Sequence, residues 1–394
     1  MQDALRSGAA TPSKAPVGPS PEAEDPWVER ARRFCAAHVG PQLRQWDRED
    51  RIPESFFRAF GKEGFLGLTI PREYEGQGLT TSQFVAVMEE LATASGAAAT
   101  MMAVDLSVAA QPILQWGNEE QRRTYLPRIA RGEWIGAFGL TEPSVGSDSQ
   151  RLLTRYVREG DGWTIDGSKM FITNAAMAEV VLVFATRDAS LGAPGISCLL
   201  VRKGTPGFST AQRLDKLGIR GSETMELLFE HCHVGAGSML GREGDGFKIA
   251  MSALEGGRIG IAACSLGIAR AAFEETVRCL PRPAEDWQRS AVARMFVDVE
   301  ASRALVQKAA RLRDQGADFA GAASAAKLFA SQAAFRIASR GLEVVGREAF
   351  DKEGPCRLEQ LFRDARVLSI VEGTTEIQEL ILGRRLLGRE GARS

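Results

Sequence analysis

Trp163-Thr-Ile-Asp-Gly-Ser-Lys-Met-Phe-Ile-Thr-Asn174 lies near the middle of the 394-residue chain and decides its fold class. Two short runs with β propensity, 163–165 and 169–172, flank Asp166-Gly167, a pair that suits a tight primed turn. The stretch therefore predicts a β-hairpin. Phe171 and Thr173 are two positions apart, so a strand would place both side chains on one face.

The hairpin belongs to a longer β-rich region that extends from residue 135 to residue 246. Three more apolar runs in this region are rich in β-branched residues and are bounded by turn residues, namely 180–184, 196–201 and 227–229. Several short strands joined by turns that contain Gly and Pro predict a small barrel or sandwich.

The region before it, residues 27–134, has a helical period. Its clearest apolar face has the i, i+3, i+4, i+7 spacing and consists of Phe84, Val87, Met88 and Leu91. The same pattern places Glu89 and Glu90 on the other side of that helix. Asn118 and Gln121 have the spacing of a capping box and predict the start of another helix.

The region after it, residues 247–394, is again helical. A long apolar stripe runs from Val292 to Ala310, and residues 322–345 are rich in Ala and Ser, which lets helix backbones approach closely. The predicted fold class is therefore mainly α with a central β-barrel domain. Its parts are a disordered tail (1–26), an N-terminal helical domain (27–134), the β-barrel domain (135–246) and a C-terminal four-helix bundle (247–394). The order of elements disfavours a doubly wound sheet.

The composition excludes several classes of protein. Lys plus Arg number 49 and Asp plus Glu number 50, so the net charge of −1 offers no footprint for nucleic acid or an anionic membrane. No apolar run approaches the 18 residues of a membrane span. Six Cys without regular spacing predict reduced thiols in a cytoplasmic protein. His231-Cys-His233 lacks further ligands nearby, so no metal site is predicted.

Three segments carry groups suited to chemistry. The segment 138–148 offers hydroxyls and small residues beside an apolar wall, although an ordinary surface turn would look the same. Phe171 and Thr173 suit a flat heteroaromatic ligand, and they equally suit a barrel core. Glu372 lies between an apolar Ile-Val pair and Gly373, where a raised pKa would make it a general base for a weakly acidic C–H. The alternative is a solvated Glu at a helix end.

Together these segments resemble the acyl-CoA dehydrogenase family over residues 27–388. The matching landmarks are Thr141-Glu-Pro-x-x-Gly-Ser-Asp148, Gly167-x-Lys-Met-Phe-Ile-Thr-Asn174, Leu217-Gly-Ile-Arg-Gly-Ser222 and Arg363-Asp-Ala…Glu-Gly-Thr374. The resemblance implies an FAD-dependent enzyme that removes hydrogen across Cα–Cβ of an acyl thioester, carried by CoA or by an acyl carrier protein. It also implies electron transfer to an electron-transfer flavoprotein or another acceptor, and a homotetramer or homodimer.

The resemblance also implies roles for single residues. Glu372 matches the catalytic base, because the position used by some relatives on an earlier helix is Gly257 here. Positions around FAD are matched by Phe138, Leu140, Thr141, Ser147, Phe171, Thr173, Thr374 and Glu376. Positions on the substrate side are matched by Ser147, Arg258, Gly373 and Arg384. In the family, the backbone N–H of the base holds the thioester carbonyl.

Two segments depart from the family pattern. Residues 277–288 lack an Arg-x-x-Phe-Gly motif that reaches a neighbouring subunit's FAD, and they are about six residues shorter. Glu343-Val-Val-Gly-Arg347 stands where relatives have Gln-x-x-Gly-Gly. The altered nucleotide site leaves open a flavin-dependent oxidase or monooxygenase acting on a specialised substrate. The missing motif leaves open a catalytically silent scaffold member.

Overall fold

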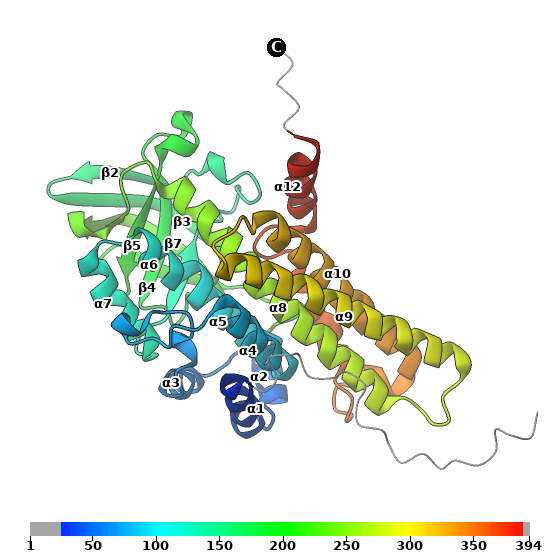
Figure 1. Cartoon of the computed structure of the whole chain (residues 1–394). Coiled ribbons are helices and arrows are strands. Elements are labelled where there is room, and N and C mark those ends of the chain that lie inside the picture. The colour runs from blue at the N-terminus through cyan, green and yellow to red at the C-terminus, as the bar shows by residue number, and fades with distance from the viewer. Residues whose placement is uncertain (1–24, 389–394) are drawn as a thin grey trace, which may run out of the picture.

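The computed structural model describes residues 25–388, and Figure 1 shows their arrangement. Most of the predicted tail, 1–26, lies outside this range, and Pro26 already begins the first helix. The helices before the sheet are α1 (Pro26–His38), α2 (Leu43–Glu49), α3 (Glu54–Lys62), α4 (Thr81–Ala94), α5 (Gly96–Ala103), a π-helical segment (Val104–Ala110), α6 (Gln111–Trp116) and α7 (Glu119–Ala130). The helices after it are α8 (Gly246–Cys279), α9 (Asp286–Asp314), α10 (Ala320–Val345), α11 (Leu358–Leu368) and α12 (Thr375–Leu387).

Between the two helical parts lies one eight-stranded sheet. Its strands are β1 (Gly136–Gly139), β2 (Arg155–Glu159), β3 (Gly162–Thr173), β4 (Val180–Thr186), β5 (Ile196–Arg202), β6 (Phe208–Arg213), β7 (Thr224–Gly235) and β8 (Met239–Leu240). Their order is β6-β7-β3-β2-β4-β5-β8, and β1 pairs with β4 in parallel. The predicted fold class, a central β part between two helical parts, is confirmed.

The predicted hairpin at Asp166-Gly167 is wrong, because β3 continues through this pair as one strand. The pairing of β3 with β7 shifts register between Ile165 and Gly167, which is the signature of a β-bulge. Gly167 is needed there for space, since a Cβ would lie 2.7 Å from Thr154 Cα of the segment before β2. Asp166 accepts a hydrogen bond from the backbone N–H of His231 at 2.7 Å. The Asp-Gly pair therefore bends the strand and does not reverse it.

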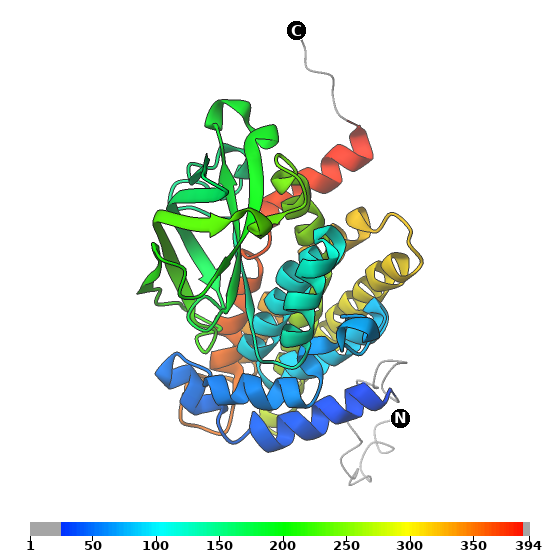
Figure 2. The ribbon, with the colours of Figure 1, turned by 90° about the vertical axis from the view of Figure 1, so that its left-hand side faces the viewer.

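The long helix α8 is the centre of the helical part. It packs against α4, α5, the π-helical segment, α9, α10 and α11. Figure 2 shows the sheet on one side of these helices, and α12 extends away from the body in both ribbon views. Asn118 and Gln121 form the predicted capping box at the start of α7. The predicted division into domains stays a prediction.

Two helical stretches are long and apolar enough to cross a membrane by length and composition. They are Gly96–Trp116 and Gly246–Cys279, and 89% and 78% of their most apolar windows are buried inside the protein. The first contains the π-helical segment, where Asp105 is buried and accepts a hydrogen bond from the Gly136 N–H at 2.7 Å. Both stretches therefore serve as core helices of this fold.

Glu89 and Glu90 of α4 lie on the side of the helix away from the predicted apolar face, and that side is also packed against other helices. Glu89 is buried and accepts hydrogen bonds from Arg270 of α8 at 2.8 Å and from Arg303 of α9 at 2.9 Å. Glu90 bonds to Arg270 and also to Arg32 of α1. Two guanidinium groups from other helices thus draw these carboxylates inward, which periodicity within one helix cannot reveal.

Two of the family landmarks meet in space at the middle of α11. The Ile219 N–H donates to Asp364 Oδ1 at 2.5 Å. A Cβ on Gly218 would lie 2.0 Å from the Arg363 carbonyl oxygen. The loop 217–222 therefore packs so closely against α11 that only glycine fits at position 218. Burial raises the pKa of Asp364 to about 7. This contact anchors the helix that leads into the Glu372 turn.

The buried cluster of Glu89, Arg270 and Arg303 yields a stability prediction. Removing Glu89 leaves two buried guanidinium groups short of a counter-charge, so Glu89→Ala is expected to lower the free energy of unfolding by about 3 kcal/mol. Urea denaturation measures this change. The control is Glu54→Ala, which removes an exposed pair with Arg58 and is expected to cost less than about 0.5 kcal/mol. Equal losses for both variants would contradict the prediction.

Candidate active site

The Glu372 carboxylate lies in the turn between α11 and α12. The residue as a whole is half-buried, but both carboxylate oxygens are inaccessible to water and have no hydrogen-bond partner among residues 25–388. The φ of Glu372 is 52°, in the left-handed region that non-glycine residues rarely adopt, and Gly373 follows with φ 95°. A strained turn that presents an unpartnered buried carboxylate indicates a functional site.

Gly257 of α8 faces this carboxylate. A Cβ built on Gly257 would lie 2.0 Å from Glu372 Oε2 and 3.0 Å from Val108 Cγ1 of the π-helical segment. Only glycine at this position leaves room for the carboxylate. Some relatives in the predicted family carry the base at the position of Gly257. A side chain at that position would therefore reach the same point in space as the Glu372 carboxylate.

Two cations influence the carboxylate from different helices. Burial raises the pKa of Glu372 to about 8, and the charges of Lys327 on α10 and Arg258 on α8 oppose this rise. Both cations are themselves buried, and burial lowers the pKa of Lys327 to about 8. The Arg258 Nε has no hydrogen-bond partner in the described part of the chain. The site thus holds one acid and two cations in a region shielded from water.

Lys327 and Gln378 hold the backbone of the Glu372 turn. Lys327 Nζ donates to the Gly373 carbonyl oxygen at 2.6 Å. Gln378 Nε2 of α12 donates to the same oxygen at 3.0 Å and to the Glu372 carbonyl oxygen at 3.4 Å. The turn is therefore fixed from α10 and from α12, while the carboxylate remains free of local partners.

An apolar cluster connects this turn with the sheet. Val104 and Val108 of the π-helical segment and Ala253 of α8 form a small buried cluster, and Phe138 of β1 packs against it. The Phe138 ring also contacts Phe184 of β4, with 4.8 Å between the ring centroids. Because Val108 also borders the Gly257 position, the predicted cofactor side and the carboxylate share one wall.

Phe171 lies on a second irregularity of β3. The pairing with β7 shifts register between Lys169 and Ile172, and Phe171 has φ 61° and is 65% exposed. A bulge re-aims a side chain out of the regular pleat. An exposed aromatic ring held by a strained backbone beside the half-buried Thr173 fits a flat heteroaromatic ligand that would cover it. The ring end of a flavin therefore matches the residues present.

A buried ion pair joins the first two family landmarks. Lys169 Nζ lies 2.7 Å from Glu142 Oε1 and donates to the Leu140 carbonyl oxygen at 3.2 Å. Glu142 also accepts from the backbone N–H groups of Leu153 and Thr154. The Met170 N–H donates to the Thr141 carbonyl oxygen at 2.8 Å. The predicted residues Leu140 and Thr141 are thereby fixed against the strand that carries Phe171 and Thr173.

The predicted site residues fall into three groups. The structure brings together the β1 and β3 residues Phe138, Leu140, Thr141, Phe171 and Thr173. It also brings together Glu372, Gly373 and Arg258. Three predicted residues are exposed and lie outside both groups, namely Ser147, Glu376 and Arg384. Thr374 caps α12, and Arg384 lies roughly 15 Å further along that helix.

Sequence reasoning did not identify Lys327, Gln378 or Asp105 as parts of this region. Lys327 is the one charged residue among the mostly small residues of 320–335, and this contrast is the only signal the sequence offers. Asp105 is buried where it bonds to Gly136, and burial raises its pKa to about 8. His231 and His233 are exposed, whereas Cys232 between them is buried in the sheet, so these three side chains do not converge.

The two segments that depart from the family pattern lie away from Glu372. The helix α8 ends at Cys279, and Pro281 and Pro283 follow in an exposed loop. Glu343 is exposed near the end of α10 and pairs with Arg340 of the same helix. Neither segment contributes a side chain to the surroundings of the carboxylate described above.

Family models match nearly the whole described chain. They are the acyl-CoA dehydrogenase N-terminal domain over residues 21–133, the middle domain over 137–232 and the C-terminal domain over 244–387. The acyl-CoA dehydrogenase of Bacillus subtilis is 39% identical over 365 residues, covering 91% of this chain and 96% of that protein. The short-chain specific acyl-CoA dehydrogenase of Clostridium acetobutylicum is 38% identical over 367 residues, with coverages of 91% and 96%.

Solved structures agree with these matches. Butyryl-CoA dehydrogenase from Megasphaera elsdenii is similar with a TM-score of 0.89 and 35% identity, covering 92% of this chain and 97% of that chain. A chain from a study of the electron transferring flavoprotein of Acidaminococcus fermentans has a TM-score of 0.89, 36% identity and the same coverages. The prolyl acyl carrier protein oxidase AnaB has a TM-score of 0.88 and 27% identity, with coverages of 92% and 98%.

The raised pKa of Glu372 yields a prediction about stability and pH. The folded state binds a proton more tightly than the unfolded chain, whose Glu titrates near 4.5, so the free energy of unfolding should fall as the pH rises from about 4.5 to 8. The loss is roughly 1.4 kcal/mol per pH unit within that window. Glu372→Gln cannot ionise and is expected to gain stability relative to the unmodified chain between pH 5 and pH 8, as measured by urea denaturation.

The control for this prediction is Glu379→Gln, an exposed carboxylate on α12. It is expected to keep the pH dependence of the unmodified chain. If Glu372→Gln and the unmodified chain lost stability in parallel between pH 5 and pH 8, the carboxylate would not have a raised pKa.

Proposed function

The chain belongs to the acyl-CoA dehydrogenase family, and we propose that it oxidises a short-chain acyl-CoA with Glu372 as the base for the α-proton. It is an FAD-dependent oxidoreductase of acyl thioesters, as its relatives are. The observation that carries the role of Glu372 is its buried, unpartnered carboxylate opposite Gly257. Because no donor among the described residues bonds to this carboxylate, its oxygens are available to accept a proton from a substrate.

The charge balance around Glu372 suits this role. The β1 and β3 residues would hold FAD, which would supply the acceptor for the hydride that leaves Cβ of the substrate. Burial raises the pKa of Glu372 to about 8, which makes the carboxylate a stronger base than an ordinary Glu. Lys327 and Arg258 limit the rise, so that the charged form stays accessible near neutral pH. The shielded site also excludes water from the proton that is transferred.

The turn also offers a hydrogen-bond donor for the thioester. The backbone N–H of Glu372 has no acceptor among the described residues. We assign it to the thioester carbonyl oxygen, where a donor stabilises the enolate-like charge that develops when the α-proton leaves. Lys327 and Gln378, through their bonds to Gly373, keep this N–H and the carboxylate in a fixed relation.

The proposed FAD site follows from the β1 and β3 geometry. The residues assigned to the ring end are Phe138, Leu140, Thr141, Phe171 and Thr173, and the exposed Phe171 ring supports this assignment. Thr374 is assigned to the cofactor at the start of α12. Ser147, Glu376 and Arg384 stay predictions for the cofactor or the substrate, and Arg258 and Gly373 are proposed on the substrate side.

The remaining partners are proposals of the same kind. CoA is favoured over a carrier protein because the short-chain acyl-CoA dehydrogenase relative is 38% identical, against 27% for the carrier-protein oxidase. An electron-transfer flavoprotein is proposed as the acceptor, supported by the similar chain from the Acidaminococcus fermentans study. A homotetramer or homodimer and a cytoplasmic location stay predictions.

The first functional prediction concerns the flavin spectrum. The FAD-loaded protein mixed anaerobically with butyryl-CoA is expected to lose its visible flavin absorbance. Glu372→Gln should keep the flavin spectrum and bleach about 10²- to 10⁴-fold more slowly, because a general base contributes that much. The matched control is Glu255→Gln, a half-buried carboxylate on α8 two residues before Gly257, which should bleach at the original rate. Stopped-flow absorbance measures all three.

Several outcomes would contradict this proposal. Unchanged bleaching in Glu372→Gln would remove the carboxylate from the mechanism. Bleaching by an acyl carrier protein thioester but not by the CoA thioester would exclude CoA as the carrier. Product formed only in the presence of oxygen would indicate an oxidase, the activity of the similar protein AnaB. If no acyl thioester bleached the flavin of the FAD-loaded protein, this result would support a catalytically silent family member.

The second functional prediction concerns Lys327. Its charge lowers the pKa of Glu372, so Lys327→Met should raise that pKa. Because the base must be deprotonated, the acid limb of the profile of log kcat against pH should move to higher pH in this variant. Lys308→Met, which removes an exposed cation from α9, serves as the control. A lower kcat with an unmoved acid limb would mean that Lys327 acts by packing alone.

A further inference from the structure

Three metal-ligating side chains meet at the far end of α8. The carboxylate of Glu275 and the thiols of Cys279 and Cys356 place one ligand atom each within 4.8 Å of one another. We call this group the thiol cluster. Glu275 and Cys279 are one helical turn apart on α8, and Cys356 comes from the loop before α11. The last turn of α8 and a segment distant in the sequence are thus brought together by the fold.

The thiol cluster is held in place by bonds around the carboxylate. Cys279 Sγ donates to Glu275 Oε2 at 3.7 Å, and the backbone N–H of Arg357 donates to the same oxygen at 3.4 Å. Arg278 pairs with the Glu275 carboxylate and donates to the Pro355 carbonyl oxygen at 2.6 Å. These bonds join α8 to the loop on both sides of Cys356, so the three donors are arranged before any ligand binds.

We propose that the thiol cluster binds one thiophilic divalent cation of the Zn²⁺ class. Thiolate and carboxylate ligands bind Zn²⁺ at about 2.3 Å and about 2.1 Å, so adjacent sulfurs around a tetrahedral ion lie about 3.8 Å apart. The separations in the cluster already approach this value, and closing it takes shifts on the order of 1 Å. Two sulfurs and one carboxylate oxygen favour a soft or borderline cation over Mg²⁺ or Ca²⁺.

The charges balance in both states. Without a cation, the Glu275 carboxylate faces the Arg278 guanidinium, and burial raises the pKa of the Cys279 thiol to about 12. With a divalent cation, two thiolates and one carboxylate give three negative charges against the cation and Arg278. Because both sulfurs bind as thiolates, a bound cation displaces the thiol protons, and affinity should increase with pH.

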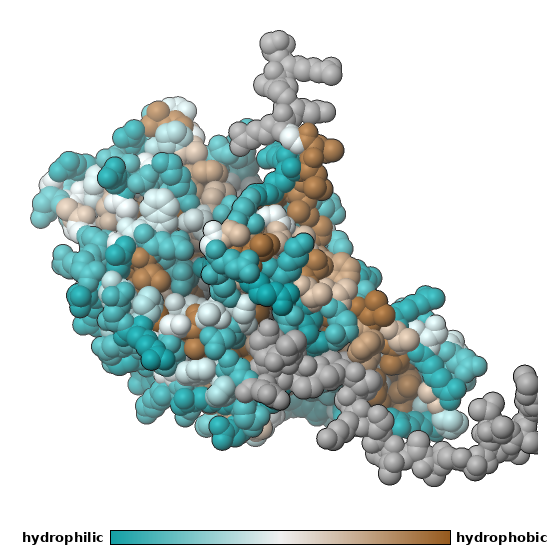
Figure 3. Space-filling view, viewed as in Figure 1, coloured by the Kyte–Doolittle hydropathy of each residue, from teal (hydrophilic) through white to brown (hydrophobic). Residues whose placement is uncertain are grey.

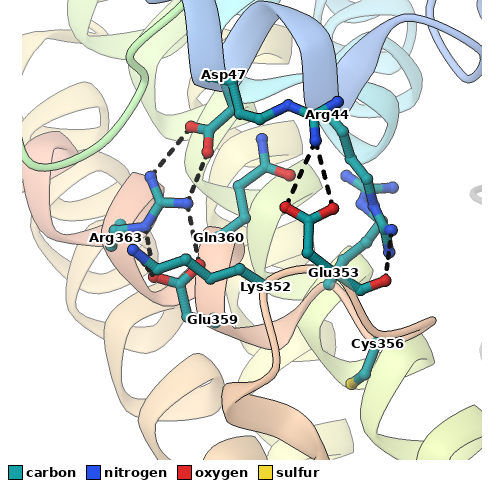
Figure 4. Close-up of a pocket in the computed structure, with 10 residues that line it drawn as sticks. Arg44, Asp47, Lys352, Glu353, Cys356, Glu359, Gln360 and Arg363 are labelled. Carbon is teal, nitrogen blue, oxygen red and sulfur yellow. Dashed lines mark hydrogen bonds and ion pairs between the residues drawn. The ribbon is translucent and has the colours of Figure 1, made fainter.

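A cavity between α2 and the α11 region borders the cluster at Cys356. Figure 4 shows Cys356 among the residues that line this cavity of about 70 Å³. The Arg363 guanidinium in it is paired with Asp47 and Glu359, and Arg44 donates to the Glu353 carbonyl oxygen at 2.9 Å.

The thiol cluster is separate from the Glu372 site. Cys279 lies 22 positions after Gly257 on the continuous helix α8, which corresponds to roughly 33 Å at 1.5 Å per residue. Glu275 and Cys279 lie on the last turn of α8, and Cys279 falls within the segment 277–288 that departs from the family pattern. Ligation of the cluster is therefore expected to stabilise this end of the helical part without entering the reaction.

The experiment titrates the chelator-treated, FAD-loaded protein with Cd²⁺ under anaerobic, reducing conditions. Difference spectra are expected to show an ultraviolet thiolate-to-metal charge-transfer band that saturates at one equivalent per chain, with protons released and competition by Zn²⁺. Cys279→Ser and Cys356→Ser should each lose the band, and Glu275→Gln should bind at least 10-fold more weakly. Cys35→Ser and Cys264→Ser, which alter buried thiols elsewhere, should keep the full band.

The flavin spectrum and thermal unfolding show whether each variant is folded. Zn²⁺ should raise the unfolding temperature of the unmodified protein and not that of Cys279→Ser. No band at several equivalents of Cd²⁺, or a band that survives the Cys279→Ser, Cys356→Ser double variant, would overturn the proposal. A disulfide between the two thiols, seen by mass spectrometry, together with no Cd²⁺ binding after reduction, would also overturn it.

Discussion

The unpartnered carboxylate of Glu372 is the constraint on which the site depends. An ionised carboxylate without a donor costs several kcal/mol to bury, and a non-glycine residue at φ 52° adds about 1–3 kcal/mol. Local bonds do not offset this, because Lys327 and Gln378 donate to backbone carbonyls and not to the carboxylate. The surrounding packing must therefore enforce the turn, and the bond from Ile219 to Asp364 anchors the helix that leads into it.

Each half of the site contains a fully buried lysine that donates a hydrogen bond to a backbone carbonyl oxygen. Lys169 holds the Leu140 carbonyl and the Glu142 carboxylate, and so fixes the segment after β1 against β3. Lys327 holds the Gly373 carbonyl, and so fixes the turn that carries Glu372. A buried ammonium needs acceptors at defined places, so each lysine tolerates one arrangement of its segment and few others. The cofactor side and the proton-accepting side thus use the same physical device.

The sequence predicted features that depend on local pattern. The capping box at Asn118 and the order of helical and β parts follow from spacing or from neighbours in the chain. The sequence-based predictions were incomplete or wrong where contacts with residues distant in the chain determine the structure. Glu89 is buried because Arg270 and Arg303 reach it from other helices, and Gly167 serves a close approach to Thr154 and not a turn. Cys279 and Cys356 meet only in the fold, so no spacing rule could pair them.

The approach of Gly257 to Glu372 explains why the base has one position in this chain. A Cβ at 257 would lie 2.0 Å from the carboxylate oxygen, far inside any van der Waals contact, and Val108 closes the opposite side. A side chain at 257 and a glutamate at 372 therefore compete for the same volume. A chain that carries the base on α8 must keep the 372 position small, and a chain that carries it at 372 needs glycine on α8. The alternative placements of the base are two solutions of one steric problem, and the base proposed for this chain corresponds to the second.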